Sequence, residues 1–493
     1  MGTKKTIVIG AGFGGLSASA LLAKKGFDVT VIEKNSNPGG KALLYKEKGF
    51  SFDMGPSWYL MLEAFENFFA EFDKTTKDFY KTVRLDPSYR VFFENDDTVD
   101  IHADLEKNFA LFDTLEENGA QKLKEYLKQS QYQYETALGG FIYRDYRSIR
   151  DILNWTILVE GMKLKIFKNL DKLARQYFSS DKARKLVEYS IAFVGGAPHI
   201  SPAIYSLLTH CDLNLGVWYP MGGIGKIAES IYKLAKNQGV NFQFNQEVTR
   251  IKTKENRAYK VITNQTEYDT DIVVSSADYH HTETQILNPK YQTYPPAYWE
   301  KRVLAPSAFL IYIGLNKKIK GLLHHNLYFN HDWIGYFKDV FGSSPVWPSN
   351  PSYYVCCQTK TEPILAPPGG ESLMILVLTA PGLKDTPQIR EKYSTKILTH
   401  LDGILGENIQ DAIVVKKIFA QNDFSTLYNA YKGTALGLAH TLRQTALLRP
   451  AHQSKKITNL YYCGQYTHPG VGIPVTLISS QIVSNRIEGD HGK

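Results

Sequence analysis

Cysteine is scarce in this sequence, with four residues in 493, and none of them forms a C-x-x-C pair. Zinc sites use such pairs and small disulfide frameworks need denser cysteine, so we expect a reducing cytoplasm and no structural metal. The chain also lacks a run of about 18 apolar residues and an apolar leader with a small-residue cleavage site. The sequence therefore predicts neither export nor a membrane-spanning helix.

The chain also has only a small excess of positive over negative residues. Lys and Arg number 57 against 49 Asp and Glu, a net charge of +8 spread over the whole chain, which does not by itself indicate nucleic-acid binding. Hydrophobic residues make up 43% and charged residues 22%, and the chain has no internal repeat or low-complexity stretch. The length predicts two or three globular units.

A glycine-rich turn follows the first apolar stretch. Residues 6–9 predict a buried strand, 16–25 a helix and 29–33 a second strand, which together form a βαβ unit. Between the first strand and the helix, Gly10, Gly12 and Gly15 fit the pattern G-x-G-x-x-G. Glycines at these positions permit a tight turn, the close approach of a pyrophosphate to a helix N-terminus, and the packing of helix on strand. The pattern predicts a dinucleotide site, without distinguishing FAD from NAD.

An acidic residue completes the dinucleotide pattern. Glu33 ends the second strand, where a carboxylate can accept a hydrogen bond from a ribose 2′-hydroxyl. A carboxylate there favours an adenosine ribose without a 2′-phosphate.

Further along, the sequence departs from the α/β pattern and returns to it. Residues from about 104 to 186 have helical spacing, 291–379 are rich in β-branched and aromatic residues, and helix and strand signals resume near 217 and again near 460. The first domain is therefore expected to be discontinuous.

Three separated blocks carry a family resemblance: NPGGK at 37–41 with FDMGPSWY at 52–59, WYPMGG at 218–223, and YTHPGVGIP at 466–474. Together with the glycine turn they resemble the flavoprotein superfamily of amine oxidases, Rab escort proteins and carotenoid desaturases. Within it the whole chain is most similar to bacterial-type phytoene desaturases. Lys41 stands where arginine is commoner in that family, and Gln465 and Tyr466 replace Ala and Gly of a common Gly-Ala-Gly.

The resemblance implies an α/β fold with a discontinuous Rossmann-like FAD-binding domain and a mixed sheet-plus-helical domain for substrate and membrane association. We expect the FAD-binding domain at 1–75, 205–285 and 440–493, a mainly helical substrate and membrane-associating region at 76–204, and a strand-rich substrate domain at 286–439. The FAD-binding residues predicted by motif and resemblance together are Gly10, Ala11, Gly12, Gly14, Gly15, Glu33, Lys34, Gly40, Lys41, Gly55, Pro56, Ser57, Val248, Gly464, Gln465, Gly472, Ile473 and Pro474.

A helix beginning near Pro474 also has a physical role independent of the family. Proline suits the first turn of a helix, and the unpaired N–H groups of that turn would stabilise negative charge on a reduced flavin beyond Gly472.

Histidine pairs and a basic segment allow more than one interpretation. The pairs at 280–281 and 324–325 suggest a metal, but neighbouring strand residues point to opposite faces, so no metal site is predicted. His468, in the expected flavin loop, could either fix the loop by a hydrogen bond or take part in catalysis. The basic amphipathic profile of residues 163–185 fits a monotopic anchor on anionic lipid and equally an ordinary helix with a solvated face.

The implied reaction is the removal of two hydrogens from adjacent carbons of a membrane-derived polyene, one as hydride to FAD and one as a proton. The resemblance implies phytoene desaturation by a protein peripheral to the inner face of the cell membrane, with oxygen or a quinone as electron acceptor. No catalytic residue is predicted. A hydroxycarotenoid 3,4-desaturase, a carotenoid isomerase or saturase, a flavin amine oxidase and a cofactor-free lipid escort protein share the fold and stay open as alternatives.

Overall fold

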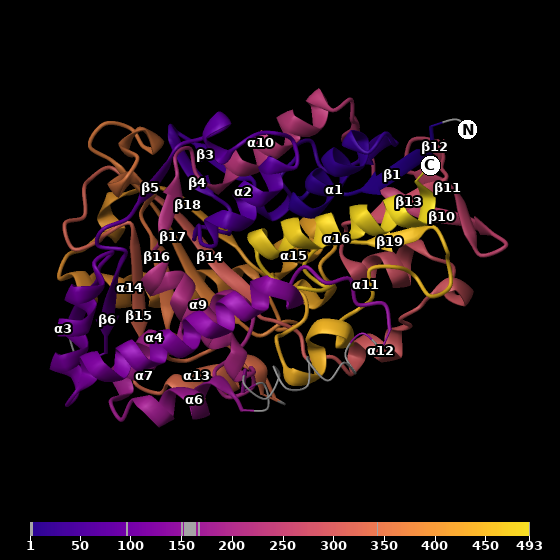
Figure 1. Cartoon of the computed structure of the whole chain (residues 1–493). Helices are drawn as coiled ribbons and strands as arrows, with labels where there is room; N and C mark the ends of the chain where they lie inside the picture. The colour runs from indigo at the N-terminus through magenta and orange to yellow at the C-terminus, as the bar shows by residue number, and fades with distance from the viewer. Residues whose placement is uncertain are drawn as a thin grey trace.

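The computed structural model describes residues 3–94, 97–148, 151, 164–165, 168–342 and 344–492. Figure 1 shows two lobes. One carries both chain termini and a parallel sheet, and the other is organised around a larger mixed sheet.

The parallel sheet has the strand order β19-β13-β1-β2-β9, and its neighbouring strands all pair in parallel. Its strands come from three distant stretches of the chain, so this lobe is discontinuous, as the sequence predicts. The strands are β1 (Lys5–Ile9), β2 (Asp28–Ile32), β9 (Asn241–Gln243), β13 (Ile272–Ser275) and β19 (Leu460–Tyr462).

Both faces of this sheet are covered, which explains why its strands read as continuous apolar runs. On one face, Val8 and Val274 pack with three helices, α1 (Phe13–Lys24), α10 (Ile224–Asn237) and α16 (Ile473–His491). On the other face, Ile7 and Val273 pack with a three-stranded sheet of β10 (Val248–Lys254), β11 (Arg257–Thr263) and β12 (Glu267–Asp269). Alternate residues of one strand thus belong to two different layers.

The second sheet has the order β18-β14-β17-β16-β15-β6-β7. Its strands are β6 (Tyr89–Phe93), β7 (Thr98–Ile101), β14 (Ser307–Leu315), β15 (His325–Phe329), β16 (Tyr353–Cys356), β17 (Glu371–Thr379) and β18 (Ile413–Phe419). Because β6 pairs with β15, the strands β6 and β7 belong to this sheet and not to the helical region predicted at 76–204.

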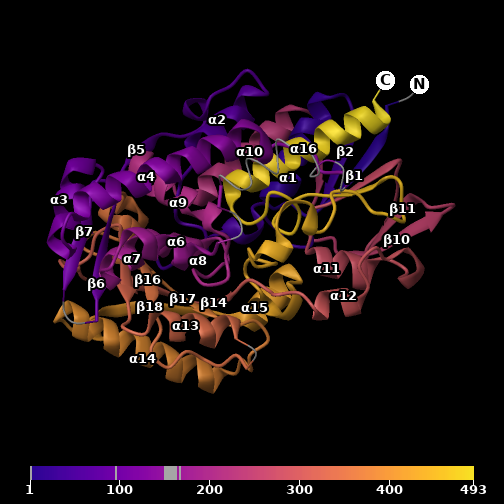
Figure 2. The ribbon, with the colours of Figure 1, turned by 60° about the horizontal axis from the view of Figure 1, so that its bottom comes forward.

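Helices cover this sheet on both sides, as Figure 2 shows. On one side, Phe309 and Ile311 of β14 pack against α14 (Pro387–Leu405). On the other side, Ala308 and Leu310 face a layer of helices that includes α13 (Trp333–Phe341) and the predicted helical region. The helices of this layer from residue 105 onward, which extend past the predicted region as far as α9, are α3 (Leu105–Leu115), α4 (Gly119–Thr136), α6 (Leu170–Tyr177), α7 (Asp181–Glu188), α8 (Ser190–Phe193) and α9 (Leu207–Thr209).

The described part of the basic segment at 163–185 forms two helices and not one, and the role of this segment at a lipid surface stays a prediction. The two helices are α6 and α7, which are separated by a break before Ser180, the residue that caps α7. Lys185 is buried and its Nζ donates to the carbonyl of Asn330 at 2.8 Å while pairing with Asp181 at 2.7 Å. Lys163 and Phe167, which belong to the same pattern, lie outside the described residues.

Further helices and short strands complete the two lobes. They are β3 (Leu44–Glu47), β4 (Phe50–Asp53), α2 (Leu62–Ala70), β5 (Thr82–Arg84), β8 (Trp218–Pro220), α11 (Tyr279–His281), α12 (Pro296–Glu300) and α15 (Gln421–Tyr428). Among the helices in the described part of the chain, none combines the length and apolarity that crossing a bilayer requires.

Candidate functional site

A single elongated cavity of about 750 Å³ runs from the glycine turn after β1 into the space between the second sheet and the helical region. All of the predicted FAD-binding residues line it except Ala11 and Gly15. Segments that are hundreds of residues apart, including Gly10, Lys41 and Gly472, therefore meet at one site.

The glycine turn leaves room for a ligand where the motif predicts it. A Cβ placed on Gly12 would find its nearest heavy atom, the Cα of Gly40, 3.9 Å away, so the space beside this residue is open toward the cavity. A Cβ on Gly15 would lie 1.9 Å from the carbonyl oxygen of Gly10, so that glycine permits the packing of α1 against β1. The geometry thus shows the close helix–strand packing at Gly15 and leaves at Gly12 the open space that the predicted pyrophosphate contact requires.

Glu33 is held in place by the protein at the end of β2. One oxygen of its carboxylate accepts from the N–H of Ala11 at 2.7 Å, and the other accepts from the N–H of Asn35 at 2.8 Å. Ala11 therefore contacts the site through its backbone N–H, although it does not line the cavity. Lys34 lines the cavity, and its Nζ donates to the carbonyl of Thr426 and to Asn429 Oδ1, each at 2.8 Å.

Lys41 and Gln465, which both depart from the family pattern, contact one another. The Lys41 Nζ donates to the carbonyl of Ala435 at 2.6 Å and to Gln465 Oε1 at 3.2 Å. Burial lowers the pKa of Lys41 to about 8, and the nearby Asp278 carboxylate opposes this shift.

The N-terminus of α16 faces the cavity, as the sequence predicts. Gly472 precedes the helix with φ of 129°, a conformation that favours glycine, and Ile473 and Pro474 form its first turn. The preceding loop is fixed from behind, because Ser479 Oγ accepts from the N–H of Gly464 at 3.0 Å. Unpaired N–H groups of the first turn are therefore directed at the site where negative charge was predicted.

Sequence reasoning missed the turn after β13. Ser276, Ala277 and Asp278 line the cavity beside Val248, and Asp278 accepts a hydrogen bond from the Tyr466 hydroxyl at 2.7 Å. These residues could have been predicted, because they follow the carboxyl end of a third parallel strand, and open α/β sheets bind ligands at that edge.

The far end of the cavity is apolar and was not predicted residue by residue. It is walled by the second sheet on one side and by helices on the other. Its lining includes Ala308, Leu310, Leu376 and Leu378 from β14 and β17, and Ala137, Leu138, Phe193, Leu207 and Leu208 from the helical region.

A hydrogen-bonded pair, His440 and Tyr205, lies among the polar side chains of this lining. The N–H of Val471 donates to His440 Nε2 at 3.4 Å, and burial lowers the pKa of His440 well below its usual value, so the neutral ring carries its proton on Nδ1. That proton points to the hydroxyl of Tyr205, which also hydrogen-bonds to Thr445. In this pair His440 Nδ1 is therefore the donor and the Tyr205 hydroxyl oxygen is the acceptor.

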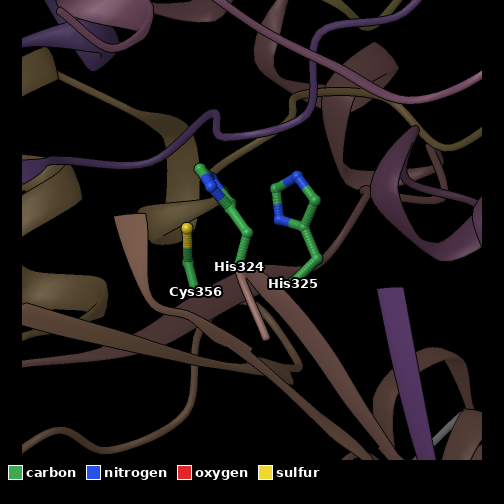
Figure 3. A group of neighbouring side chains, drawn as sticks. All are labelled: His324, His325 and Cys356. Atoms are coloured by element: carbon green, nitrogen blue, oxygen red, sulfur yellow. The ribbon is translucent and has the colours of Figure 1, made fainter. Parts of the chain in front are cut away.

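The histidine pair at 324–325 approaches a cysteine, as Figure 3 shows. The expectation that these histidines point apart is wrong, because His324 precedes the first residue of β15 and the two rings lie 4.4 Å apart. One ligand atom from each histidine and the Cys356 sulfur all lie within 4.8 Å of one another, whereas an ion with bonds of about 2.0–2.3 Å draws its ligands to roughly 3.3–3.8 Å.

Each histidine of this group has one nitrogen in a hydrogen bond, while its Nε2 is buried without a partner. Nδ1 of His324 lies 2.6 Å from Thr361 Oγ1, and Nδ1 of His325 lies 2.6 Å from the Tyr354 hydroxyl. Burial lowers the pKa of His324 to about 3, so the ring stays neutral. We assign no ion to this group.

The donor set fits FAD. The open space beside Gly12, the carboxylate of Glu33 at the strand end, and the N-termini of α1 and α16 lie along one cavity. These features would hold the pyrophosphate, the adenosine ribose and, at α16, the flavin of the dinucleotide.

Known proteins show the same relationship over the full length. Residues 13–487 match the family described as flavin containing amine oxidoreductase. The chain is 40% identical over 476 residues to a carotenoid 3,4-desaturase of Haloarcula japonica, covering 96% of each chain. It is 31% identical over 491 residues to a zeta-carotene-forming phytoene desaturase of Myxococcus xanthus, covering 98% of this chain and 94% of the relative.

Solved structures share the fold at low identity. An oxidoreductase from Methanosarcina mazei superimposes with a TM-score of 0.64 at 17% identity, covering 98% of this chain and all of the other. Cyclohexylamine oxidase from Brevibacterium oxydans gives a TM-score of 0.60 at 12% identity, with both chains covered completely. With the match over residues 13–487 and relatives above 30% identity over almost the whole length, the chain belongs to the FAD-dependent flavin-containing amine oxidoreductase family and, within it, to the carotenoid desaturases.

Proposed function

We propose that this protein introduces double bonds into an acyclic carotenoid, with phytoene as the first candidate substrate. The observation that carries the proposal is the apolar arm of the cavity, which begins beside the flavin end of the dinucleotide site and is walled by Leu310 and Leu376 on one side and Phe193 on the other. Such an arm fits a hydrocarbon chain and offers little to a charged amine.

The chain's own residues orient the substrate and exclude water, while bound FAD supplies the two-electron acceptor for a hydride. The buried lining holds the polyene against the loop that ends at Gly472. Hydride loss leaves an allylic cation that the polyene delocalises, and an adjacent proton then leaves to form the double bond. Oxygen or a membrane quinone is the proposed final electron acceptor.

The decisive experiment is the pigment profile of a phytoene-accumulating bacterium that expresses this chain. Coloured products with more conjugated double bonds than phytoene support the proposal, and chromatography counts the steps. A product of unchanged mass would indicate an isomerase, and folded yellow protein beside unchanged phytoene would contradict the phytoene assignment.

A second candidate substrate is a hydroxylated acyclic carotenoid, desaturated at the 3,4 position. The specific observation is the Tyr205 hydroxyl, a polar group in the cavity lining that is held by His440 and Thr445 and could bind a substrate oxygen. The 40% identical relative named a carotenoid 3,4-desaturase supports the same choice.

Substitution Tyr205→Phe separates the two substrates. If the Tyr205 hydroxyl binds a substrate oxygen, kcat/KM for a hydroxylated carotenoid should fall about 5- to 30-fold, the cost of one lost hydrogen bond, while phytoene conversion changes little. Rates with purified enzyme and each substrate measure this. An equal fall for both substrates would mean that Tyr205 only packs.

The proposed substrate enters from a membrane through the loop at 442–448. Leu442 and Leu448 line the cavity, yet they are 40% and 54% exposed, so the cavity reaches the surface here. Arg443 between them is exposed as well. Apolar side chains beside a cation at a cavity opening fit a monotopic contact with anionic lipid, and they support the proposed location at the inner face of the cell membrane.

The double substitution Leu442→Ser with Leu448→Ser should weaken binding to anionic phospholipid vesicles by about tenfold or more, because two apolar side chains no longer insert. Co-sedimentation with vesicles measures the effect. The matched control is Ile364→Ser, which removes an 84% exposed side chain away from the cavity. Equal losses for both variants would contradict entry at this loop.

A further inference from the structure

His468 lies in the loop before α16 and lines the cavity. Its Nε2 is 3.1 Å from the carbonyl oxygen of Phe141 and 3.0 Å from that of Ile142. Carbonyl oxygens only accept hydrogen bonds, so Nε2 must carry the proton of the neutral ring. The loop-fixing role considered from the sequence is therefore performed by this one nitrogen.

The other nitrogen of the ring is left over. Nδ1 is buried and has no hydrogen-bond partner, and with the proton on Nε2 it holds a lone pair. A buried acceptor without a partner costs free energy, which calls for a functional reason. Burial, followed by the nearby His452, lowers the pKa of His468 to about 3, so the ring is neutral and the lone pair available at ordinary pH.

Other acidic and histidine side chains that line the cavity, Glu33, Asp278 and His440 among them, have hydrogen-bond partners. Glu33 accepts backbone hydrogen bonds at the ribose end, and Asp278 accepts from the Tyr466 hydroxyl. His440 accepts from the N–H of Val471 with one nitrogen and donates to Tyr205 with the other. Among these described residues, His468 is the one with a buried ring nitrogen that has no hydrogen-bond partner.

We propose that Nδ1 of His468 accepts the proton that leaves the carotenoid during desaturation. The inference rests on the proposed function. Hydride leaves one carbon with its electron pair and passes to the oxidised flavin, and the proton on the adjacent carbon then bonds to the lone pair of Nδ1. The electron pair of that second C–H bond becomes the new double bond, which discharges the cation on the substrate. The ring becomes an imidazolium and returns its proton to solvent before the next turnover.

A weak base is adequate for this step. A C–H bond beside a carbocation is strongly acidic, so a neutral imidazole of low pKa removes its proton readily. The dry surroundings keep water from adding to the cation. A strongly hydrated base would bring water close to the cation.

The test is His468→Gln, because the glutamine amide can still donate to the carbonyls of Phe141 and Ile142 but offers no basic nitrogen. We expect the variant to fold, to retain FAD, and to lose about 100-fold or more of its desaturation rate. The matched control is His452→Gln, since His452 is also buried and close by but does not line the cavity. It should keep most of its rate.

Isotope effects distinguish catalysis from packing. With substrate deuterated at the carbon that loses the proton, the isotope effect on the rate should increase in His468→Gln, whereas deuterium at the hydride-donating carbon should give no increase. Nitrogen NMR of histidine-labelled protein without substrate should show one unprotonated Nδ1 that disappears in this variant. Wild-type rates in His468→Gln, or equal changes of both isotope effects, would overturn the inference, while failure of the wild-type enzyme to convert any carotenoid would overturn the proposed function instead.

Discussion

Replacing Gly12 with tryptophan is expected to give a folded, colourless protein that retains no FAD and produces no carotenoid pigment. Gly12 has φ of −75°, which any residue can adopt, and the space beside it is open, so the backbone tolerates a side chain. The indole would fill the space in which the pyrophosphate approaches the N-terminus of α1. Flavin absorbance of the purified protein and the pigment profile of the expressing cells measure the two losses.

The matched control carries the same tryptophan at Gly403. This glycine is exposed in α14, no heavy atom lies within 4 Å of its Cβ position, and it is far from the cavity lining. Gly403→Trp should retain flavin and pigment. If Gly12→Trp also bound FAD normally, the dinucleotide would not lie along this turn.

The substitution Asp212→Asn is expected to remove a pH dependence of stability worth several kcal/mol. Asp212 is buried among aromatic side chains, and the hydroxyls of Tyr89 and Tyr189 each donate to its Oδ2 at 2.8 Å. Burial raises the pKa of Asp212 from 3.8 to about 7, against the opposing effect of the two tyrosine bonds.

The sign follows from proton binding. Between pH 4 and 7 the folded protein holds a proton on Asp212 that the unfolded chain has lost, so the free energy of unfolding falls as the pH rises through this window and is constant above it. A shift of this size corresponds to about 4 kcal/mol as an upper bound. Asparagine does not titrate. Between pH 4 and pH 8, the stability of Asp212→Asn relative to wild type should therefore rise by up to this amount.

Denaturant unfolding of both proteins at pH 4, 6 and 8 measures this difference. The exposed Asp28→Asn on β2 is the control and should show no such change. A constant difference between Asp212→Asn and wild type at all three pH values would mean that Asp212 stays ionised in the folded protein.

The part of the site that could be predicted is the part encoded by local geometry. Within one βαβ unit, Gly10 allows the tight turn, Gly12 the close approach of a phosphate, and Gly15 the packing of helix on strand. The spacing of these glycines along the chain is therefore enough to predict the turn. The N-terminus of α16 was predictable for the same reason, because Gly472 and Pro474 mark the start of a helix.

The rest depends on contacts between distant segments. Tyr205 and His440 meet only because the helical region folds over the second sheet, and no local pattern indicates which tyrosine will face the cavity. Lys185 of the basic segment misled for a related reason, since it looks like a surface residue until the carbonyl of Asn330 is placed beside it. Charge patterns predict exposure only when the partners of each charge are known.

The position of the two chain ends affects how the protein is made. α1 packs against α16, and Lys4 near the first strand donates to the carbonyl of His491 at the end of the last helix. The first and last segments of the chain therefore lie side by side in the same lobe, as Figure 1 shows. A ribosome adding roughly 5–20 residues per second needs about 20–90 s to go from the second strand to the last helix. During that time the apolar strand β1 and helix α1 are outside the ribosome without their partner. Flavin capture is therefore a late event in synthesis, and the nascent chain depends on chaperones or on early burial elsewhere to keep its first residues from aggregating.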